Sequence, residues 1–140
     1  SAPRDLPQTP NPTTIMAVTL NFAVEVAPGE SERSFTLYRT TVSADFAGET
    51  KSDGSSHKFW TVDARYSDFA DLCDKVGEMV DEKFPEKVTW GGRDAAVVRN
   101  RMFGLPVWLK AASQVPKVME HAAFREFLKL DENLAVAKTV

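Results

Sequence analysis

The chain has 140 residues, a net charge of −3, and 43% hydrophobic and 26% charged residues. Such a length and composition predict one soluble globular domain with a real core, and the acidic balance argues against a dedicated nucleic-acid binder, so no nucleic-acid partner is expected. One cysteine, Cys73, leaves no internal disulfide framework and no cysteine-based zinc site, and with only two histidines besides we expect no metal.

The first fourteen residues contain four prolines and almost no large apolar side chain, which predicts a disordered linker over residues 1–14. A folded domain is expected over residues 15–134, and a C-terminal tail over residues 135–140. No apolar run approaches the roughly 18 residues of a membrane span, and no signal peptide is evident. We therefore expect a cytoplasmic module that belongs to a larger protein.

Three strands are predicted first. In Ile15–Val26, apolar residues alternate with small or polar ones, which is typical of a strand with one buried face. A turn at Ala27–Glu30 leads to a second strand at Ser34–Ser43, which is rich in β-branched and aromatic residues. After a polar loop at Gly48–Ser56, a third strand is expected at Lys58–Tyr66. Without intervening helices, these strands favour an antiparallel meander.

Beyond the third strand the apolar period becomes helical. Ser67 is a candidate N-cap for the first helix and Asp94 for the second, and Pro106 predicts a kink or a fresh start. The expected helices are Asp68–Lys83, Ala95–Phe103 with a continuation after Pro106, and about His121–Leu130. The predicted fold is α+β: a three-stranded antiparallel meander followed by a helical subdomain of three to four helices.

Catalytic chemistry finds little support in the sequence. Cys73 follows Leu72 in the first predicted helix, where a buried thiol is expected, although a nucleophile paired with a distant histidine is an alternative. His57 and His121 are expected to be solvated or to cap a helix. Since no nucleotide, protease or hydrolase motif is present, we expect no enzyme, no catalytic residue and no cofactor.

Basic residues are unevenly distributed. Between Lys83 and Arg101 there are five of them against two acidic residues, so this segment suits an anion and the remainder repels one. A solvated helix face explains the same charges equally well. Arg65 ends the third strand just before a helix N-terminus, where free N–H groups also favour anions, and Tyr66 adds an aromatic face. Val88 and Trp90 follow Lys87 in a loop, which indicates contact with a membrane interface; the alternative for Trp90 is a loop anchor packed on the core.

These residues resemble the motifs of phox homology (PX) domains. Arg65-Tyr66-Ser67-Asp68-Phe69 is similar to the R-Y-x-D/E-F motif that ends the third strand of that family. In family order there follow a proline-containing loop (Phe84–Lys87), R-x-x-G-L (Arg101, Gly104, Leu105), an aromatic–leucine pair (Trp108-Leu109) and F-x-x-F-L (Phe124, Phe127, Leu128). The resemblance spans about Met16 to Glu132.

The resemblance implies a phosphoinositide-binding, membrane-targeting module like those of sorting nexins and other trafficking or signalling proteins. The commonest ligand in the family is phosphatidylinositol 3-phosphate, and its place is the endosomal membrane. Carried over by position, Arg65 would hold the 3-phosphate, Tyr66 would stack under the inositol ring, and Lys87 would meet the 1-phosphate. Arg101 would bond the 4- and 5-hydroxyls, and Val88 and Trp90 would occupy the membrane-inserting loop.

Two departures from the family pattern leave an alternative open. Ala64 stands where many members have a second basic residue, which implies too few cations for a more highly phosphorylated lipid, and the loop retains only Pro85 of a P-x-x-P signature. The alternative is therefore a PX-fold protein-interaction domain with weak or no lipid binding, so protein partners are also expected to be possible.

Overall fold

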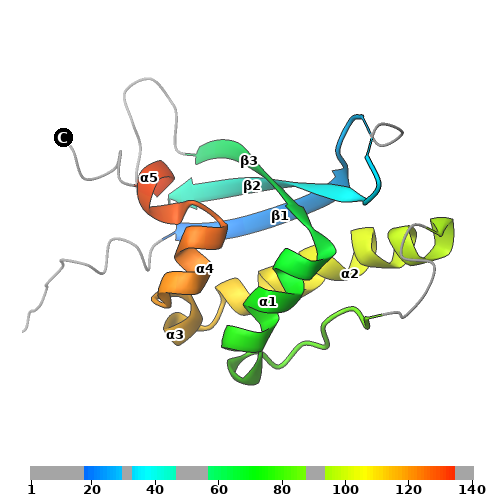
Figure 1. Cartoon of the computed structure of the whole chain (residues 1–140). Helices are drawn as coiled ribbons and strands as arrows, with labels where there is room; N and C mark the ends of the chain where they lie inside the picture. The colour runs from blue at the N-terminus through cyan, green and yellow to red at the C-terminus, as the bar shows by residue number, and fades with distance from the viewer. Residues whose placement is uncertain (1–17, 30–32, 47–56, 88–93, 135–140) are drawn as a thin grey trace, which may run out of the picture.

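A computed structural model describes residues 18–29, 33–46, 57–87 and 94–134. Three strands form an antiparallel sheet in the order β1-β2-β3: β1 (Val18–Val26), β2 (Leu37–Phe46) and β3 (His57–Arg65). The described helices all lie on one face of this sheet, and none of them covers the opposite face (Figure 1). The predicted α+β meander is therefore confirmed.

The alternation expected from the sequence sorts the side chains of the sheet. Along β1, Leu20 is buried while Thr19 and Asn21 are exposed, and along β3 Val62 and Ala64 are buried between exposed neighbours. The even-numbered positions therefore face the helices. The odd-numbered positions form the open face, which includes a cross-strand row of Glu25, Arg39 and Asp63.

Helix α1 (Tyr66–Val76) begins immediately after β3 and passes into a 3₁₀ turn, η4 (Gly77–Met79). The prediction of a helix over Asp68–Lys83 capped by Ser67 is wrong at both ends. Arg65 is the N-cap residue, and its backbone N–H donates to the Asp68 carboxylate over 3.0 Å. That bond satisfies a free donor at the helix start, so Ser67 is not needed there.

Helix α2 (Ala95–Ser113) runs through Pro106 without a break, contrary to the kink or fresh start expected there. A proline within a helix removes one hydrogen bond, here the one to the Met102 carbonyl. Packing outweighs that loss, because Leu105, Trp108 and Leu109 around the proline are all fully buried or nearly so. Asp94 is the N-cap residue, as predicted.

Three short helices follow in the described part of the chain: α3 (Pro116–Met119), α4 (Ala122–Phe127) and α5 (Leu130–Leu134). The last two replace the one helix predicted over His121–Leu130, because Lys129 adopts a positive φ of 56° that ends one helix and starts the next. None of the described helices is long and apolar enough to cross a membrane.

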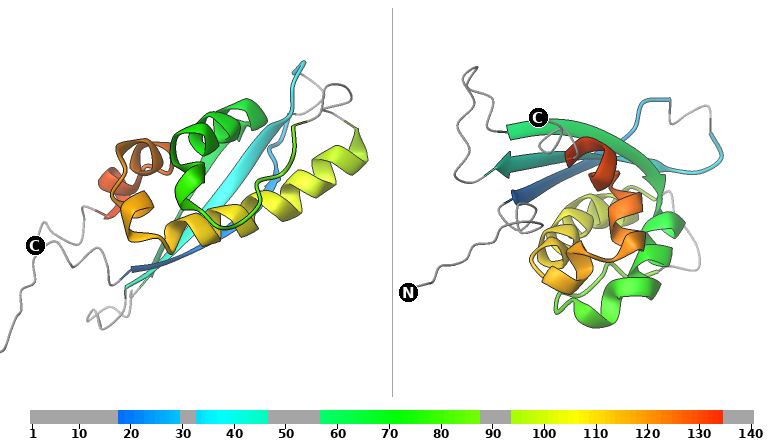
Figure 2. Two further views of the ribbon diagram at one scale, coloured as in Figure 1. Left: turned by 90° about the horizontal axis from the view of Figure 1, so that it is seen from below. Right: turned by 90° about the vertical axis from the view of Figure 1, so that its left-hand side faces the viewer.

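The core fills the space between the helical face of the sheet and the helices. Its largest fully buried side chains include Trp108, Tyr38, Phe69 and Phe124. Phe69 meets Tyr38 edge-on at 6.5 Å and Phe127 at 4.9 Å, so the sheet, α1 and α4 share one aromatic cluster. β1 begins and α5 ends at one end of the sheet, whereas α2 begins at the other (Figures 1 and 2).

Candidate functional site

Arg101 of α2 is the only charged residue of the described chain that is almost fully buried, with 7% of its surface exposed. Its guanidinium carbon lies 3.7 Å from the centre of the Tyr66 ring, in a cation–π contact. Within the part of the chain that the structure describes, nothing accepts a hydrogen bond from its Nε. A buried donor of this kind is costly to leave unpaired, which makes Arg101 a candidate for binding an acceptor from outside.

Tyr66 connects α1 to the segment that precedes α2. Its hydroxyl donates to the Pro85 carbonyl over 2.6 Å, and its ring lies 5.7 Å from that of Phe84. Burial raises the pKa of Tyr66, and the positive charge of Arg101 only partly opposes this rise. The phenol therefore keeps its proton at neutral pH and remains a hydrogen-bond donor.

Pro85 lies directly against Gly104 of α2. A Cβ atom at position 104 would lie 2.7 Å from Cγ of Pro85, closer than two carbon atoms can approach. The loop can rest on the helix only because residue 104 has no side chain. The proline of one sequence motif and the glycine of the other thus pack against each other.

A cavity of about 340 Å³ lies between this loop and α2. Lys83 and Glu86 stand at its loop side, with their Nζ and Oε2 atoms 3.3 Å apart, and Arg101 at its helix side. Its lining consists of Lys83, Phe84, Pro85, Glu86, Val97, Asn100, Arg101 and Gly104. Arg65, Tyr66 and Lys87 are not among the residues that line it.

Arg65 is exposed and belongs by alternation to the open face of the sheet. Its guanidinium carbon lies 4.3 Å from the centre of the Phe35 ring. Phe35 stands two residues before Leu37, which pairs with Arg65 across the strands. Sequence reasoning missed this partner, because the contact depends on which strand ends meet. It also missed the roles of Phe84 beside Tyr66 and of Asn100 in the cavity lining, which depend on how the loop folds onto α2.

The structure thus brings together some of the predicted site residues and leaves others apart. Tyr66 and Arg101 are in direct contact, and the loop that carries Lys87 is held by Tyr66. Lys87 itself is exposed. Val88 and Trp90, the predicted insertion residues, lie outside the described residues.

The remaining candidates have ordinary structural roles. The Nδ1 atom of His121 accepts a bond from the Ala123 N–H over 3.1 Å and caps α4, as expected. His57 packs edge-on against Phe59 at 5.3 Å. Burial, and secondarily the charge of Asp74, raises the pKa of the half-buried Cys73, which disfavours the thiolate that a nucleophile needs. The described residues contain no group of three or more side chains suited to a metal ion.

Comparison with known proteins places these features in a family. A family model described as the PX domain matches residues 52–131. The structural match to a designed CISK-PX domain covers 80% of this chain and 97% of that domain, with 23% sequence identity and a TM-score of 0.52. The match to the mouse SNX19 PX domain, which was crystallised with a bound sulphate ion, covers 81% of this chain and 98% of that domain, with 22% sequence identity and a TM-score of 0.57. Curated proteins give no match.

Proposed function

The chain belongs to the PX domain family of phosphoinositide-binding modules, and on that premise we propose that it recognises phosphatidylinositol 3-phosphate and so attaches a larger trafficking or signalling protein to endosomal membranes. Binding is peripheral: the headgroup is held by side chains of the folded domain while a loop contacts the bilayer. The domain spans residues 15–134 in this proposal.

The observation that carries the proposal is the buried, incompletely bonded guanidinium of Arg101 beside a cavity. Phosphate and hydroxyl oxygens are the acceptors that such a donor lacks, and charge-assisted bonds to them contribute about 1.5–3 kcal/mol each. Arg101 bonds the inositol 4- and 5-hydroxyls in this scheme. The sulphate ion bound by the similar mouse domain has the tetrahedral oxygens of a phosphate group.

The other predicted residues supply the remaining contacts. Arg65 holds the 3-phosphate and Lys87 the 1-phosphate, because a planar guanidinium grips two oxygens and an ammonium tolerates looser geometry. Tyr66 supports the ring of the sugar. For Arg65 this requires its guanidinium to leave or share its contact with Phe35, whose cation–π attraction at an exposed site is only about 0.5–1 kcal/mol.

Liposome co-sedimentation tests the proposal on wild type, Arg65→Ala and Arg101→Ala. Arg99→Ala is the matched control, since Arg99 is an exposed arginine of the same helix and is absent from the cavity lining. Both test variants should lose binding to vesicles with phosphatidylinositol 3-phosphate, and the control should lose at most about fivefold, the share of one basic side chain near the bilayer. Unchanged binding by folded Arg65→Ala and Arg101→Ala would reject the proposed site.

Membrane insertion is tested separately at Trp90. Trp90→Ala should weaken binding to vesicles more than binding to the soluble headgroup, because only the vesicle offers an apolar layer to the ring. Equal losses for the two ligands would mean that Trp90 serves the fold or the headgroup contact instead.

The second candidate is a PX-fold protein-interaction domain that binds lipid weakly. Two observations favour it: Arg65 is engaged with Phe35, and Ala64, where many members carry a basic residue, is buried among apolar side chains. A titration across all phosphoinositides separates the two functions. No binding to any of these lipids by the wild-type chain would select the protein-interaction function.

A further inference from the structure

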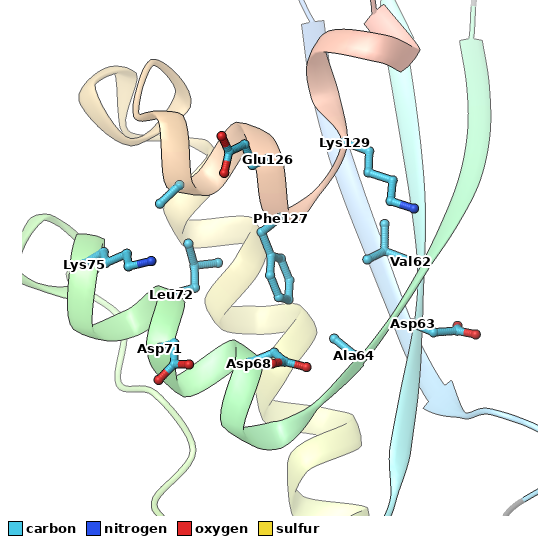
Figure 3. Close-up of a pocket in the computed structure, with 11 residues that line it drawn as sticks. Val62, Asp63, Ala64, Asp68, Asp71, Leu72, Lys75, Glu126, Phe127 and Lys129 are labelled. Atoms are coloured by element: carbon cyan, nitrogen blue, oxygen red, sulfur yellow. The ribbon is translucent and has the colours of Figure 1, made fainter.

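A second and larger cavity lies on another side of the molecule, between β3, α1 and α4 (Figure 3). Its volume is about 410 Å³, and it shares no lining residue with the cavity beside Arg101. The lining consists of Val62, Asp63, Ala64, Asp68, Asp71, Leu72, Lys75, Ala123, Glu126, Phe127 and Lys129. The proposed lipid site leaves this cavity without a role.

One wall of the cavity is the edge strand of the sheet. In the part of the chain that the structure describes, β3 pairs with β2 alone, so the other side of β3 presents backbone N–H and C=O groups that no strand satisfies. Val62, Asp63 and Ala64 of this strand border the cavity. An incoming extended chain could therefore pair with β3 beside the cavity.

The opposite edge of the sheet is protected. Helix α2 packs along β1, and the Lys110 ammonium donates to the Leu20 carbonyl over 2.8 Å. A lysine placed in this way blocks the approach of another strand. The two edges thus differ: helix α2 packs along β1 and Lys110 bonds its backbone, whereas a cavity opens beside β3, with Lys129 at its rim and no bond from that lysine to the strand among the described residues.

The interior of the cavity suits an apolar side chain. Val62, Ala64 and Leu72 are buried, and the Phe127 ring points into the space between α1 and β3 (Figure 3). In a strand paired with β3, alternate side chains would point toward this interior and the others toward solvent. The cavity would then accept one or two apolar side chains of the added strand.

The rim carries more negative than positive charge. Four carboxylates border the cavity against two ammonium groups, those of Lys75 and Lys129. Arg39 neutralises the Asp63 carboxylate on the open face of the sheet. Asp68 accepts a bond from the Arg65 N–H but keeps its charge, so Asp68, Asp71 and Glu126 remain as three negative charges against the two ammonium groups. An acidic rim is complementary to a basic peptide and opposed to an anionic membrane.

We propose that the β3 edge and this cavity bind an extended, basic segment of a partner protein, which adds to the sheet as a fourth strand. Its apolar side chain enters the cavity against Leu72 and Phe127, and a basic side chain meets Asp71 and Glu126. This site is independent of the lipid site, and its occupant is a peptide and not a membrane.

The test uses two synthetic peptides that alternate valine with a charged residue around a central phenylalanine, one with lysine and one with glutamate. Amide chemical shifts of the whole chain are followed by NMR during titration. The lysine peptide should shift the amides of Val62–Ala64 and of Phe127. The glutamate peptide should bind more weakly, since it meets like charge.

Matched variants locate the binding. Asp71→Lys reverses a rim charge and should weaken the lysine peptide roughly two- to fivefold; Asp74→Lys makes the same change on α1 outside the lining and should not. Ala123→Leu fills the cavity and should abolish the shifts at Phe127, whereas Ala122→Leu, at an exposed position on the same helix, should not.

Several outcomes would overturn the proposal. The proposal is wrong if the amide chemical shifts of β3 do not change, if the changes are confined to the β1 edge, or if both peptides bind equally. Self-association of the wild-type chain that Ala123→Leu removes would assign the edge to a second copy instead. Stronger vesicle binding in Asp71→Lys than in Asp74→Lys would assign this face to the membrane, because the added ammonium group would then meet anionic lipid. None of these results affects the Arg101 experiment, so failure here is distinct from failure of the lipid proposal.

Discussion

Arg101 and Tyr66 support each other through their side chains. The guanidinium covers one side of the phenol ring, and the phenol hydroxyl holds the Pro85 carbonyl. Each residue therefore organises the site in addition to any contact with a ligand. A substitution at either position should change both the stability of the domain and the loop that precedes α2.

Tyr66→Phe isolates the hydroxyl from the ring. The variant keeps the contact with Arg101 but loses the bond to Pro85, so the free energy of unfolding should fall by about 0.5–1.5 kcal/mol. Hydrogen exchange of the amides near Phe84 should become faster, because the loop loses its tether. Tyr66→Ala, measured in the same urea titration, should lower the free energy of unfolding further, because it also removes the ring. Unchanged hydrogen exchange near Phe84 in Tyr66→Phe would contradict the tethering of the loop by the hydroxyl.

The pair of Asp63 and Arg39 predicts a defined pH dependence. Two hydrogen bonds, of 2.8 and 2.9 Å, from Arg39 hold the pKa of Asp63 below its ordinary value of 3.8. A carboxyl whose pKa is lower in the folded state stabilises the protein above its unfolded pKa, and this contribution disappears as the pH falls through the folded pKa. The stability difference between wild type and Asp63→Asn should therefore be full at neutral pH and vanish in strong acid. A difference that stays constant with pH would contradict this assignment.

At the scale of single residues, the sequence shows which residues are candidates for the site better than it shows which residues they contact. Arg65, Tyr66 and Arg101 can be singled out from their positions at a strand end and in a basic segment, and Tyr66 and Arg101 do meet in the structure. The stacking of Arg65 on Phe35 could not be predicted, because it depends on the register between β2 and β3. The bond from Tyr66 to Pro85 likewise depends on how the loop folds back onto α1.

The elements that form the proposed lipid site are a loop and a helix, which touch where Pro85 meets Gly104. Gly104→Ala would add a Cβ 2.7 Å from a rigid proline ring. The helix gains about 1 kcal/mol from alanine, but steric overlap in a tight contact typically costs about 1–3 kcal/mol. We expect a net loss of about 1 kcal/mol in urea unfolding.

Pro85→Ala provides the control for that prediction. In the double variant the overlap is relieved, so the gain from alanine at position 104 should reappear relative to Pro85→Ala alone. If Gly104→Ala alone proves more stable than the wild type, the loop does not rest on the helix as described.

The elements themselves were largely predictable, and their ends were not. Period-two alternation gave β1 and β3 to within a few residues, because one face of the sheet is buried and the other open. The error at Pro106 arose because a local rule for proline was outweighed by the burial of Trp108 and Leu109. The split of the last helix at Lys129 had no signal in the sequence, since lysine rarely adopts a positive φ.

At the scale of the whole molecule, charge is divided between regions. The segment from Lys83 to Arg101 is basic within a chain of net charge −3, and the cavity rim beside β3 is acidic. Such a division orients the domain as it approaches a charged surface, with its basic end toward an anionic membrane.

Salt should therefore weaken vesicle binding. Each basic side chain near an anionic bilayer contributes about 1 kcal/mol at moderate ionic strength, so screening one of them should lower the affinity roughly fivefold. Co-sedimentation between 50 and 300 mM salt, values chosen to span a Debye length of about 14 to 6 Å, measures this loss. Binding that does not respond to salt would show that the basic segment does not face the lipid.

The positions of the first and last described elements have a practical consequence. β1 begins and α5 ends at the same end of the sheet, far from the start of α2 (Figure 1). A fluorophore or an immobilisation tag joined near Val18 or Leu134 would lie at the end of the domain remote from the start of α2, where Arg99 and Arg101 are found. Protein immobilised on a sensor chip at either position should therefore expose the basic start of α2 to the solution and remain able to bind vesicles that flow over the chip.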